Sequence, residues 1–515
     1  MRKHLSLLAG ILLPAALLAQ EKINMEVMQQ IRTEALEHSG AAELAHQLTD
    51  IAGPRLTNSP GYMRAAKWAV QTLRQWGLNK AALEPWGVFG KGWSTEHVYA
   101  AIKKPYYQPL IAFPLAWSQG TKGLVTGNAI LLDSMTITAI DRLGSNLRGK
   151  IVLLHTRDSL LKPAPAIYRY PDSVLNSLPD KYMVRRESLT RHLETAKLTA
   201  AAKKHLATKG VIALISLQGN GRDGTMEVNG HNGYAKGFEL PVPELTVTKE
   251  DFLRISRLLR SSVPVNLELD IQNKWYTDDL NGYNVIGDIT GTDPALKDEV
   301  VIAGGHLDSW HSGTGATDNG AGCVIMMEAL RILKAIGVQP RRTIRIALWG
   351  GEEQGLYGSF NYVKKHYGNP ADMQLLPAQQ QVSAYFNLDN GSGKIRGIYL
   401  QQNDAAGPVF RSWLAPFADL GATGVTRSNT GSTDHLPFDA VGIPAFQFIQ
   451  DPLEYETRTH HTNMDTYEHL SMDDIKQASA VMAAFLYNAA MRDEKLPRKP
   501  QPHAEQFVFD LNYPL

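Results

Sequence analysis

The spacing of hydrophobic positions differs between parts of the chain. Residues 26–50 and 62–78 carry apolar side chains at helical spacing, which predicts two amphipathic helices, the second ending at Gly77. From residue 298 onward, continuous apolar runs alternate with helical patterns. These runs are EVVIAGGH, RTIRIALWGG, QVSAYFNLD and GIPAFQFIQ. Strands have continuous apolar sequences when helices cover both faces of their sheet. We therefore expect an α/β fold, a three-layer αβα sandwich with a mostly parallel sheet.

Two helices are predicted between these strands. DNGAGCVIMMEALRILKAIG is apolar almost all round, which is typical of a core helix, with Asp318 or Asn319 as N-cap and Gly337 as C-cap. YGSFNYVKKH is the second predicted helix. The only cysteine, Cys323, lies in the core helix, so we expect a small buried hydrophobe and no disulfide within the chain.

The middle of the chain has shorter apolar runs interrupted by glycine. GLVTGNAILL, LRGKIVLLH and GVIALISLQGN read as β-strands, and a polar stretch over 185–210 predicts a helix before the last of them. We expect a β-rich domain inserted at 116–275, with 20–115 and 276–492 folding together around it. Residues 493–515 are polar and proline-punctuated, and they predict a tail along the surface.

The N-terminus begins with Arg2 and Lys3 and continues with LSLLAGILLPAALLA. This pattern is typical of a secretory signal peptide over residues 1–19, cleaved near Ala19; a buried helix is the alternative. We therefore expect a secreted or periplasmic protein. No later run reaches the roughly 18 apolar residues of a membrane span. The chain has 52 basic and 51 acidic residues, and this near-neutral balance argues against nucleic acid as the main partner.

Imidazole and carboxylate side chains follow three of the predicted strands. In open α/β sheets, ligands bind beyond the carboxyl ends of the strands. A glycine-rich loop and the stretch THHTNMDT add further side chains of the same kind. Imidazole with carboxylate is the ligand mixture expected for zinc, with cobalt or manganese as alternatives. The strand-end residues are His306, Glu352, Glu353 and Asp389, and the glycine-rich loop carries Asp318.

Other motifs count against competing enzyme classes. GNGRDG fits the pattern GxGxxG, but TMEVNGHNGY follows it in place of a helix, so we expect no dinucleotide site. The chain has no HExxH and no GxSxG sequence. Their absence argues against a single-zinc HExxH metalloprotease and a serine hydrolase.

Five motifs in order, GGHLDS, ATDNGAG, GGEEQGLYGS, FNLDNG and HTNMDT, resemble the motif series of the co-catalytic zinc exopeptidases. This is the family of the bacterial leucyl aminopeptidases, aminopeptidase S and glutamate carboxypeptidase. The segment with LRGKIVLLH and GVIALI resembles the protease-associated domain that many members carry. The resemblance covers nearly all of the chain after residue 19, and it implies the zinc exopeptidase fold with such a domain inserted.

The resemblance also implies two zinc ions, with ligands assigned motif by motif. Asp318 would bridge both ions. The choice of His461 over the neighbouring His460 rests on the family pattern His-Thr/Ser…Asp-Thr. The remaining ligands would be His306 and Asp389 for one ion, and Glu353 and His461 for the other.

Four further residues have expected roles. Asp308 would orient the imidazole of His306, a common arrangement at zinc sites. Glu352 would be the general base. GSTDHLPFDAVGIPAF resembles a family loop near the substrate pocket, where Asp434 and His435 are expected to shape the pocket.

We therefore expect an exported dizinc exopeptidase that acts at the ends of peptides or dipeptides, with release of N-terminal amino acids favoured. A carboxypeptidase is the first alternative, and Arg427 and Arg458 are candidate partners for the substrate carboxylate. A glutaminyl cyclase with one zinc ion and a catalytically inactive binding protein are the others. An oligomer such as a dimer is left open.

Overall fold

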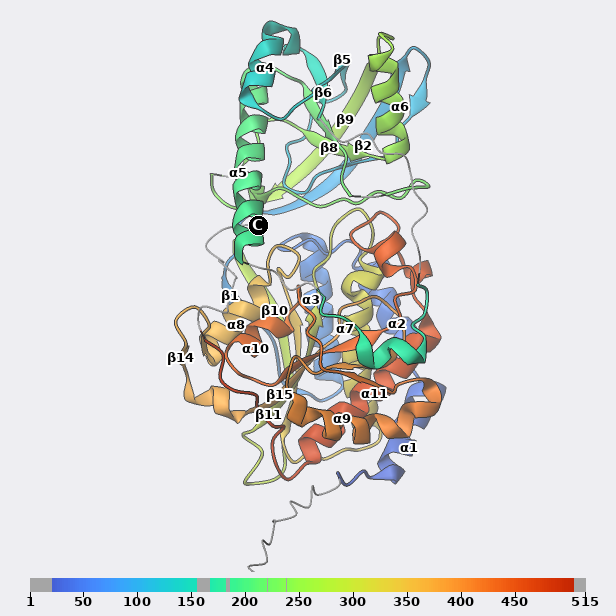
Figure 1. Cartoon of the computed structure of the whole chain (residues 1–515), viewed down its shortest axis with the longest axis vertical. Helices are drawn as coiled ribbons and strands as arrows, with labels where there is room; N and C mark the ends of the chain where they lie inside the picture. Colours follow the sequence, from blue (N-terminus) through green and yellow to red (C-terminus); the bar gives the residue numbers. More distant parts are fainter. Residues whose placement is uncertain (1–20, 155–166, 182–185, 220, 238, 504–515) are drawn as a thin grey trace, which may run out of the picture.

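The computed structural model describes residues 21–154, 167–181, 186–219, 221–237 and 239–503. The predicted signal peptide and the last twelve residues of the predicted tail lie outside this part of the chain. The described residues form two units, each built on its own eight-stranded sheet (Figure 1). We call the unit containing residues 92–276 the inserted unit and the remaining described residues the main unit.

The sheet of the main unit is mixed. Its strands are β1 (Asn79–Val88), β10 (Asn281–Ile289), β11 (Val300–His306), β12 (Thr343–Trp349), β15 (Val382–Asn387), β16 (Ile395–Tyr399), β17 (Gly424–Thr426) and β18 (Ala445–Gln450). Their order is β1-β10-β12-β11-β15-β18-β16-β17. The central strands β12, β11, β15 and β18 run parallel, whereas β1, β10 and β16 add antiparallel pairings. The expected parallel arrangement therefore holds for the centre of the sheet.

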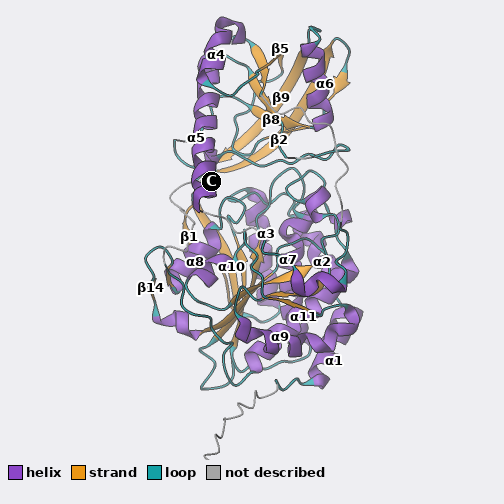
Figure 2. Cartoon of the chain, viewed as in Figure 1, coloured by secondary structure: helices purple, strands orange, loops and turns teal. Residues whose placement is uncertain are grey.

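Helices cover both faces of this sheet, as the continuous apolar strand sequences predict (Figure 2). Ile302 of β11 packs on one face, and its neighbours Val301 and Ala303 pack on the other. The larger face carries α1 (Met25–Glu37), α2 (Ala41–His46), α3 (Pro60–Gln75), α7 (Ala321–Ala335), α9 (Gly407–Leu414) and α11 (Met472–Met491). The smaller face carries α8 (Tyr357–His366) and α10 (His435–Ala440).

The start of α7 agrees with one of the two predicted caps. The regular helix begins at Ala321, directly after Gly320. Asn319 caps it, because its Oδ1 atom accepts the N–H group of Gly322 at 3.0 Å, whereas Asp318 makes no such bond. Both residues belong to a preceding distorted turn, η5 (Ala316–Gly320), and Asp318 is extended there, with φ −125° and ψ 89°. The carboxylate of Asp318 is thus released from capping the helix and is available to the site.

The inserted unit also has a mixed sheet with helices on both faces. Its strands are β2 (Gly92–Lys104), β3 (Gln108–Pro109), β4 (Ala112–Pro114), β5 (Val125–Leu131), β6 (Lys150–Leu153), β7 (Ala213–Ser216), β8 (Glu244–Val247) and β9 (Asn266–Tyr276). One face packs on α6 (Lys249–Arg260), and the other on α4 (Ile137–Leu143) and α5 (Arg186–Thr208). Strands β2–β4 lie upstream of the predicted boundary at residue 116. The boundaries and the likeness to a protease-associated domain remain predictions.

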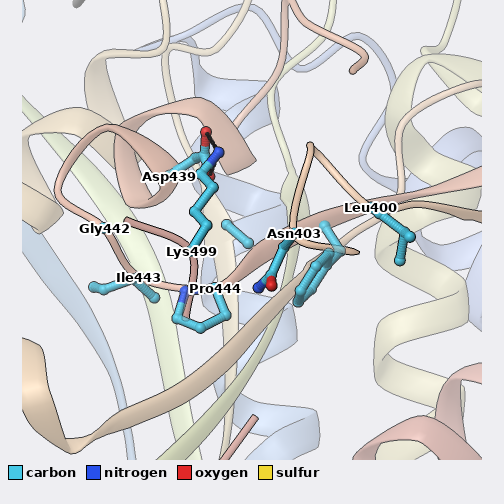
Figure 3. Close-up of a pocket in the computed structure, with 9 residues that line it drawn as sticks. Leu400, Asn403, Asp439, Gly442, Ile443, Pro444 and Lys499 are labelled. Atoms are coloured by element: carbon cyan, nitrogen blue, oxygen red, sulfur yellow. Dashed lines mark hydrogen bonds and ion pairs between the residues drawn. The ribbon is translucent and has the colours of Figure 1, made fainter. Parts of the chain in front are cut away.

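Two segments outside the main sheet pack against the main unit. Leu175 and Leu178, between β6 and α5, pack against Tyr399 and Ile449 of the main sheet. At the C-terminal end, Lys499 Nζ lies 2.8 Å from Asp439 Oδ2 beside a narrow hollow (Figure 3). The described part of the tail therefore lies against the main unit. Within the described residues, no helix has both the length and the apolarity of a membrane span.

The remaining short elements lie outside the two large sheets or at helix ends. They are the two-stranded pair β13 (Gly368–Asn369) and β14 (Gln374–Leu375), and the turns η1 (Gln47–Ile51), η2 (Gly144–Leu147), η3 (Asp172–Ser177), η4 (Asn232–Tyr234), η6 (Pro377–Gln381), η7 (Asp404–Ala406), η8 (Ala415–Leu420), η9 (Tyr455–Thr459) and η10 (Tyr467–His469).

Candidate active site

Three central strands of the main sheet end at one edge. In the register, His306 of β11 pairs with Trp349 of β12, and Gly304 pairs with Asn387 of β15. Polar side chains that end or follow these strands therefore meet above the sheet. Two loops complete the group from elsewhere in the chain: η5 before α7 and the turn after η9. The structure brings all five predicted ligands together here.

Asp318 lies between the two halves of this group. Its Oδ1 atom is 3.3 Å from His306 Nε2, and its Oδ2 atom is 3.3 Å from His461 Nε2. His306 Nε2 is also 3.3 Å from Asp389 Oδ1. His461 Nε2 is 3.0 Å from Glu353 Oε2. Each half therefore has one imidazole and one carboxylate of its own, and they share Asp318.

His460 and His461 both lie near Asp318, and their rings stack with centroids 3.8 Å apart. Ligand atoms of His460, His461 and Asp318 lie within 4.8 Å of one another, so the three could hold a metal ion together. His460 Nε2 is 3.9 Å from Asp318 Oδ2, farther than the 3.3 Å of His461. The proximity of Glu353 to His461 likewise favours His461 as the ligand.

The donor set fits divalent cations. Within the described chain, the buried oxygens Asp318 Oδ2 and Glu353 Oε1 have no hydrogen-bond partner. Buried carboxylates are stable when they are paired or bind a metal. Imidazole nitrogen with carboxylate oxygen is the set that zinc binds. The five residues could therefore hold two ions, one in each half, with Asp318 common to both.

The electrostatics of the site reflect this crowding of carboxylates. Burial raises the pKa of Glu353 well above its ordinary value, and the charge of Asp318 raises it further. Burial alone would lower the pKa of His306, but the charges of Asp389 and Glu352 raise it well above its usual range. A bound cation would relieve the same repulsion between carboxylates.

Asp308 contacts His306 through its backbone and the glutamates through its side chain. The carbonyl oxygen of Asp308 lies 3.0 Å from His306 Nδ1, which can donate to it in the appropriate tautomer. The nearest carboxylate oxygen is 3.7 Å from the same nitrogen. Both carboxylate oxygens accept backbone N–H groups, one from Glu352 and one from Glu353, each at 3.2 Å. Thr57 Oγ1 donates to the same carboxylate at 2.9 Å. Asp308 therefore contacts the backbone that carries both glutamates.

Glu352 and Glu353 approach opposite halves of the site. Glu352 Oε2 is 3.8 Å from His306 Nε2, whereas Glu353 lies against His461. The side chain of Glu352 is 9% exposed and that of Glu353 is 2% exposed. Glu352 is thus the more accessible carboxylate beside the group.

Two residues without a predicted role support the ligand loops. Asp465 accepts the backbone N–H groups of Thr317 and Asp318, at 2.6 and 3.1 Å. Asp465 is the aspartate of the motif HTNMDT, and its place in that motif is the sequence signal that could have identified it. Burial raises the pKa of Asp465 to about 7. Arg55 is fully buried and donates to the carbonyl groups of Leu307, Leu48, Thr314 and Gly315.

Asp434 and His435 lie at the start of α10 in the main unit, and both are fully buried. Burial raises the pKa of Asp434 to about 8 and lowers that of His435 to about 4. His435 Nε2 lies 2.9 Å from the carbonyl oxygen of Thr430, and Thr430 lines a nearby cavity. The role of Asp434 and His435 in shaping the pocket remains a prediction.

The cavity lies between the ligand loops and residues 170–181, and its empty volume is about 410 Å³ when the open solvent at its mouth is included. Its walls include Asn390, which follows Asp389, and Tyr455, whose ring centroid is 4.9 Å from that of His460. Lys181 and Glu456 contribute opposite charges to the lining. Arg427 and Arg458 are not among the lining residues; they pair with Asp404 and Glu454.

Comparisons with known proteins agree with this architecture. Human carboxypeptidase Q is 28% identical over 454 residues, which cover 88% of this chain and 85% of that protein. The crystal structure of a peptidase M28 precursor from Shewanella amazonensis matches with a TM-score of 0.67 and 25% identity, over 94% of this chain and 100% of that one. A zinc aminopeptidase from Bacillus subtilis shares the fold, with a TM-score of 0.54 and 21% identity over 88% of this chain and 95% of that one. The sequence model described as Peptidase family M28 matches residues 284–486, which include all five predicted ligands. The match to peptidase family M28 therefore spans residues 284–486, and the chain is a metallo-exopeptidase.

Proposed function

We propose that this enzyme binds two zinc ions and releases N-terminal amino acids from peptides or dipeptides. One observation carries the proposal: Asp318 presents one carboxylate oxygen to His306 and the other to His461, each at 3.3 Å. A carboxylate shared in this way is suited to bridging two cations. The zinc aminopeptidase with the same fold supports zinc as the metal and the amino end as the site of cleavage.

Five residues would hold the ions: His306 and Asp389 one, Glu353 and His461 the other, and Asp318 both. Zinc ions bound there would polarise the scissile carbonyl, lower the pKa of the attacking water and stabilise the charge that develops. The protein contributes the orientation of these groups. Asp308 fixes the backbone of both glutamates, and Asp465 fixes the backbone of the shared aspartate.

Glu352 is the general base in this proposal. Its carboxylate lies beside the ligand group without being needed as a ligand, and it is the more exposed of the two glutamates. It takes a proton from the attacking water and delivers that proton to the departing amine. The scissile bond is thereby cleaved without a covalent enzyme intermediate.

A carboxypeptidase is the second candidate, and Lys181 is the observation that favours it. A carboxypeptidase needs a cation facing the terminal carboxylate of its substrate, and Lys181 lines the cavity beside Asn390. Glu456 lines the same cavity and could accept the free amine of an aminopeptidase substrate. The similarity of this chain to human carboxypeptidase Q also supports a carboxypeptidase function.

Zinc stoichiometry tests the metal centre. We expect two zinc ions per chain by metal analysis after dialysis, and activity that a chelator abolishes and zinc restores. One ion per chain together with cyclisation of N-terminal glutamine would identify a glutaminyl cyclase. A folded protein that binds no zinc would contradict the proposal and favour a binding protein.

A panel of free and N-acetylated peptides tests the direction of cleavage. We expect free peptides to lose N-terminal residues and acetylated peptides to remain intact, as followed by mass spectrometry. Loss of C-terminal residues from acetylated peptides would overturn the aminopeptidase assignment. In that case, Lys181→Met should raise KM for these peptides while zinc content stays unchanged.

We also propose that the protein is exported, on the basis of the signal-peptide pattern of residues 1–19. Expression of the full chain with N-terminal sequencing of the product provides the test. A mature protein in the periplasm or medium that begins near Gln20 is expected, and an uncleaved cytoplasmic product would contradict export.

A further inference from the structure

His461 has an unusual backbone for a residue with a side chain. Its φ angle is +58°, in the left-handed region that few residues other than glycine adopt. Such conformations persist when surrounding contacts hold them. The same residue has its imidazole 3.0 Å from Glu353 and 3.3 Å from Asp318. The contacts that hold this turn therefore bear on the site.

A strip of the inserted unit, residues 224–228, runs alongside this turn. The N–H group of Val228 donates to the carbonyl oxygen of His461 at 2.8 Å, and Asn463 N–H donates to Met226 O at 3.2 Å. Glu227 and Thr462 form an antiparallel bridge between the two segments. The backbone of the ligand turn is thus paired with backbone from the inserted unit.

The side chain of Asn463 extends this pairing. Its Oδ1 atom accepts the N–H group of Met226 at 2.8 Å, and its Nδ2 atom donates to Gly224 O at 3.2 Å. Asn463 therefore bonds the strip at both of its polar atoms, two residues after His461.

The strip is itself anchored within the inserted unit. Met226 and Val228 pack in a small apolar cluster with Leu115. Just beyond them, Ala116 and Gly230 form a further backbone bridge. A Cβ atom on Gly230 would lie 2.8 Å from Ala116 Cβ, so the close approach of these segments requires glycine. The strip therefore contacts both the rest of the inserted unit and the ligand turn.

We propose that the strip 224–228 is a positioning element of the metal centre and that Asn463 is its main positioning residue on the ligand turn. The inserted unit then holds His461 where its imidazole faces Glu353 and Asp318. This inference rests on the proposed dizinc function. Partners that orient a ligand in this way typically change metal affinity by roughly 10–100-fold when they are removed.

The experiment compares zinc retention in the full-length protein and its Asn463→Ala variant. Both are loaded with zinc and dialysed against chelators of graded strength, and zinc per chain is measured. We expect the variant to release one ion at a free zinc concentration roughly 10–100-fold higher than the wild type does. The second ion, assigned to His306 and Asp389, should be retained as in the wild type.

Asn266→Ala is the matched control, because it removes an asparagine side-chain bond to Asn128 within the inserted unit, away from the ligand turn. It should leave the affinities for both ions unchanged. Circular dichroism of the zinc-free proteins establishes that each variant is folded. Two ions bound with wild-type affinity by folded Asn463→Ala would overturn the inference. A wild type that does not bind two ions would instead contradict the proposed function.

Discussion

Adjacent residues at the site have different surroundings, and this difference predicts different consequences of substitution. Glu352 lies beside His306 at 3.8 Å, whereas Glu353 contacts His461 at 3.0 Å. A glutamine at either position keeps the size of the side chain and removes its charge. The two substitutions should therefore separate proton transfer from metal binding.

We expect Glu352→Gln to retain two zinc ions and to lower kcat by roughly 10²–10⁴-fold, the range for loss of a general base. Metal analysis and steady-state kinetics on the same preparation provide the measurement. Glu353→Gln is the comparison variant and should lose zinc. Near-normal turnover by Glu352→Gln would remove this residue from the role of base.

Single residues were predictable where a local pattern marked them. The strand-end pattern marks His306, Glu352, Glu353 and Asp389, and the structure gathers them at one sheet edge. The role of Asp308 differs in detail, because its carboxylate accepts two backbone N–H groups, a contact that residue spacing does not reveal. The metal-ligand roles themselves remain predictions.

Among the elements, β11, β12, β15 and α8 follow the predicted segments closely, because a buried strand or a helix between strands has a local apolar signature. Aspartate and asparagine are both good capping residues, so the sequence leaves the cap of α7 open between Asp318 and Asn319. The structure uses Asn319, and the carboxylate of Asp318 faces the site. No prediction covered α11, although it is one of the main core helices.

Arg55 connects elements that are distant in sequence, which is why no sequence pattern indicated it. Its guanidinium bonds the carbonyl groups of Leu307, Thr314 and Gly315 on the glycine-rich loop. We expect Arg55→Leu to lower the free energy of unfolding by about 3 kcal/mol, because it leaves several buried carbonyls without a donor. Urea denaturation of the zinc-free protein would measure this.

The control for this prediction is Arg64→Leu. Arg64 is exposed and donates one hydrogen bond, to Ala52 O, so its loss should change stability by less than about 1 kcal/mol. Equal effects of the two substitutions would show that the buried bonds of Arg55 contribute little.

For the whole molecule, the predicted α/β sandwich is recovered as a mixed sheet with helices on both faces. The predicted insertion corresponds to a second sheet, but β2, β3 and β4 join it from before residue 116. Strand β2 pairs along its length with β9, which lies at the far end of the inserted unit in sequence. Such long-range pairing has no local sequence signature. The change to shorter apolar runs near residue 116 therefore could not show that β2, β3 and β4 belong to the inserted unit.

Zinc removal should destabilise the whole main unit, because the five predicted ligands come from separate strand ends and loops. A ligand at about 1,000 times its dissociation constant stabilises the folded state by about 4 kcal/mol per site. We therefore expect chelation to lower Tm by several degrees in differential scanning calorimetry, and zinc but not calcium to restore it. An unchanged Tm would contradict metal binding by the folded state.

The pairing of residues 224–228 with the turn at His461 has a thermodynamic corollary. Coupling free energies are reciprocal: whatever the strip adds to the binding of zinc, zinc adds to the attachment of the strip. Loss of zinc should therefore loosen the junction between the two sheets, and a displaced inserted unit should hold zinc less firmly. Metal supply would in this way influence how rigidly the enzyme holds its shape.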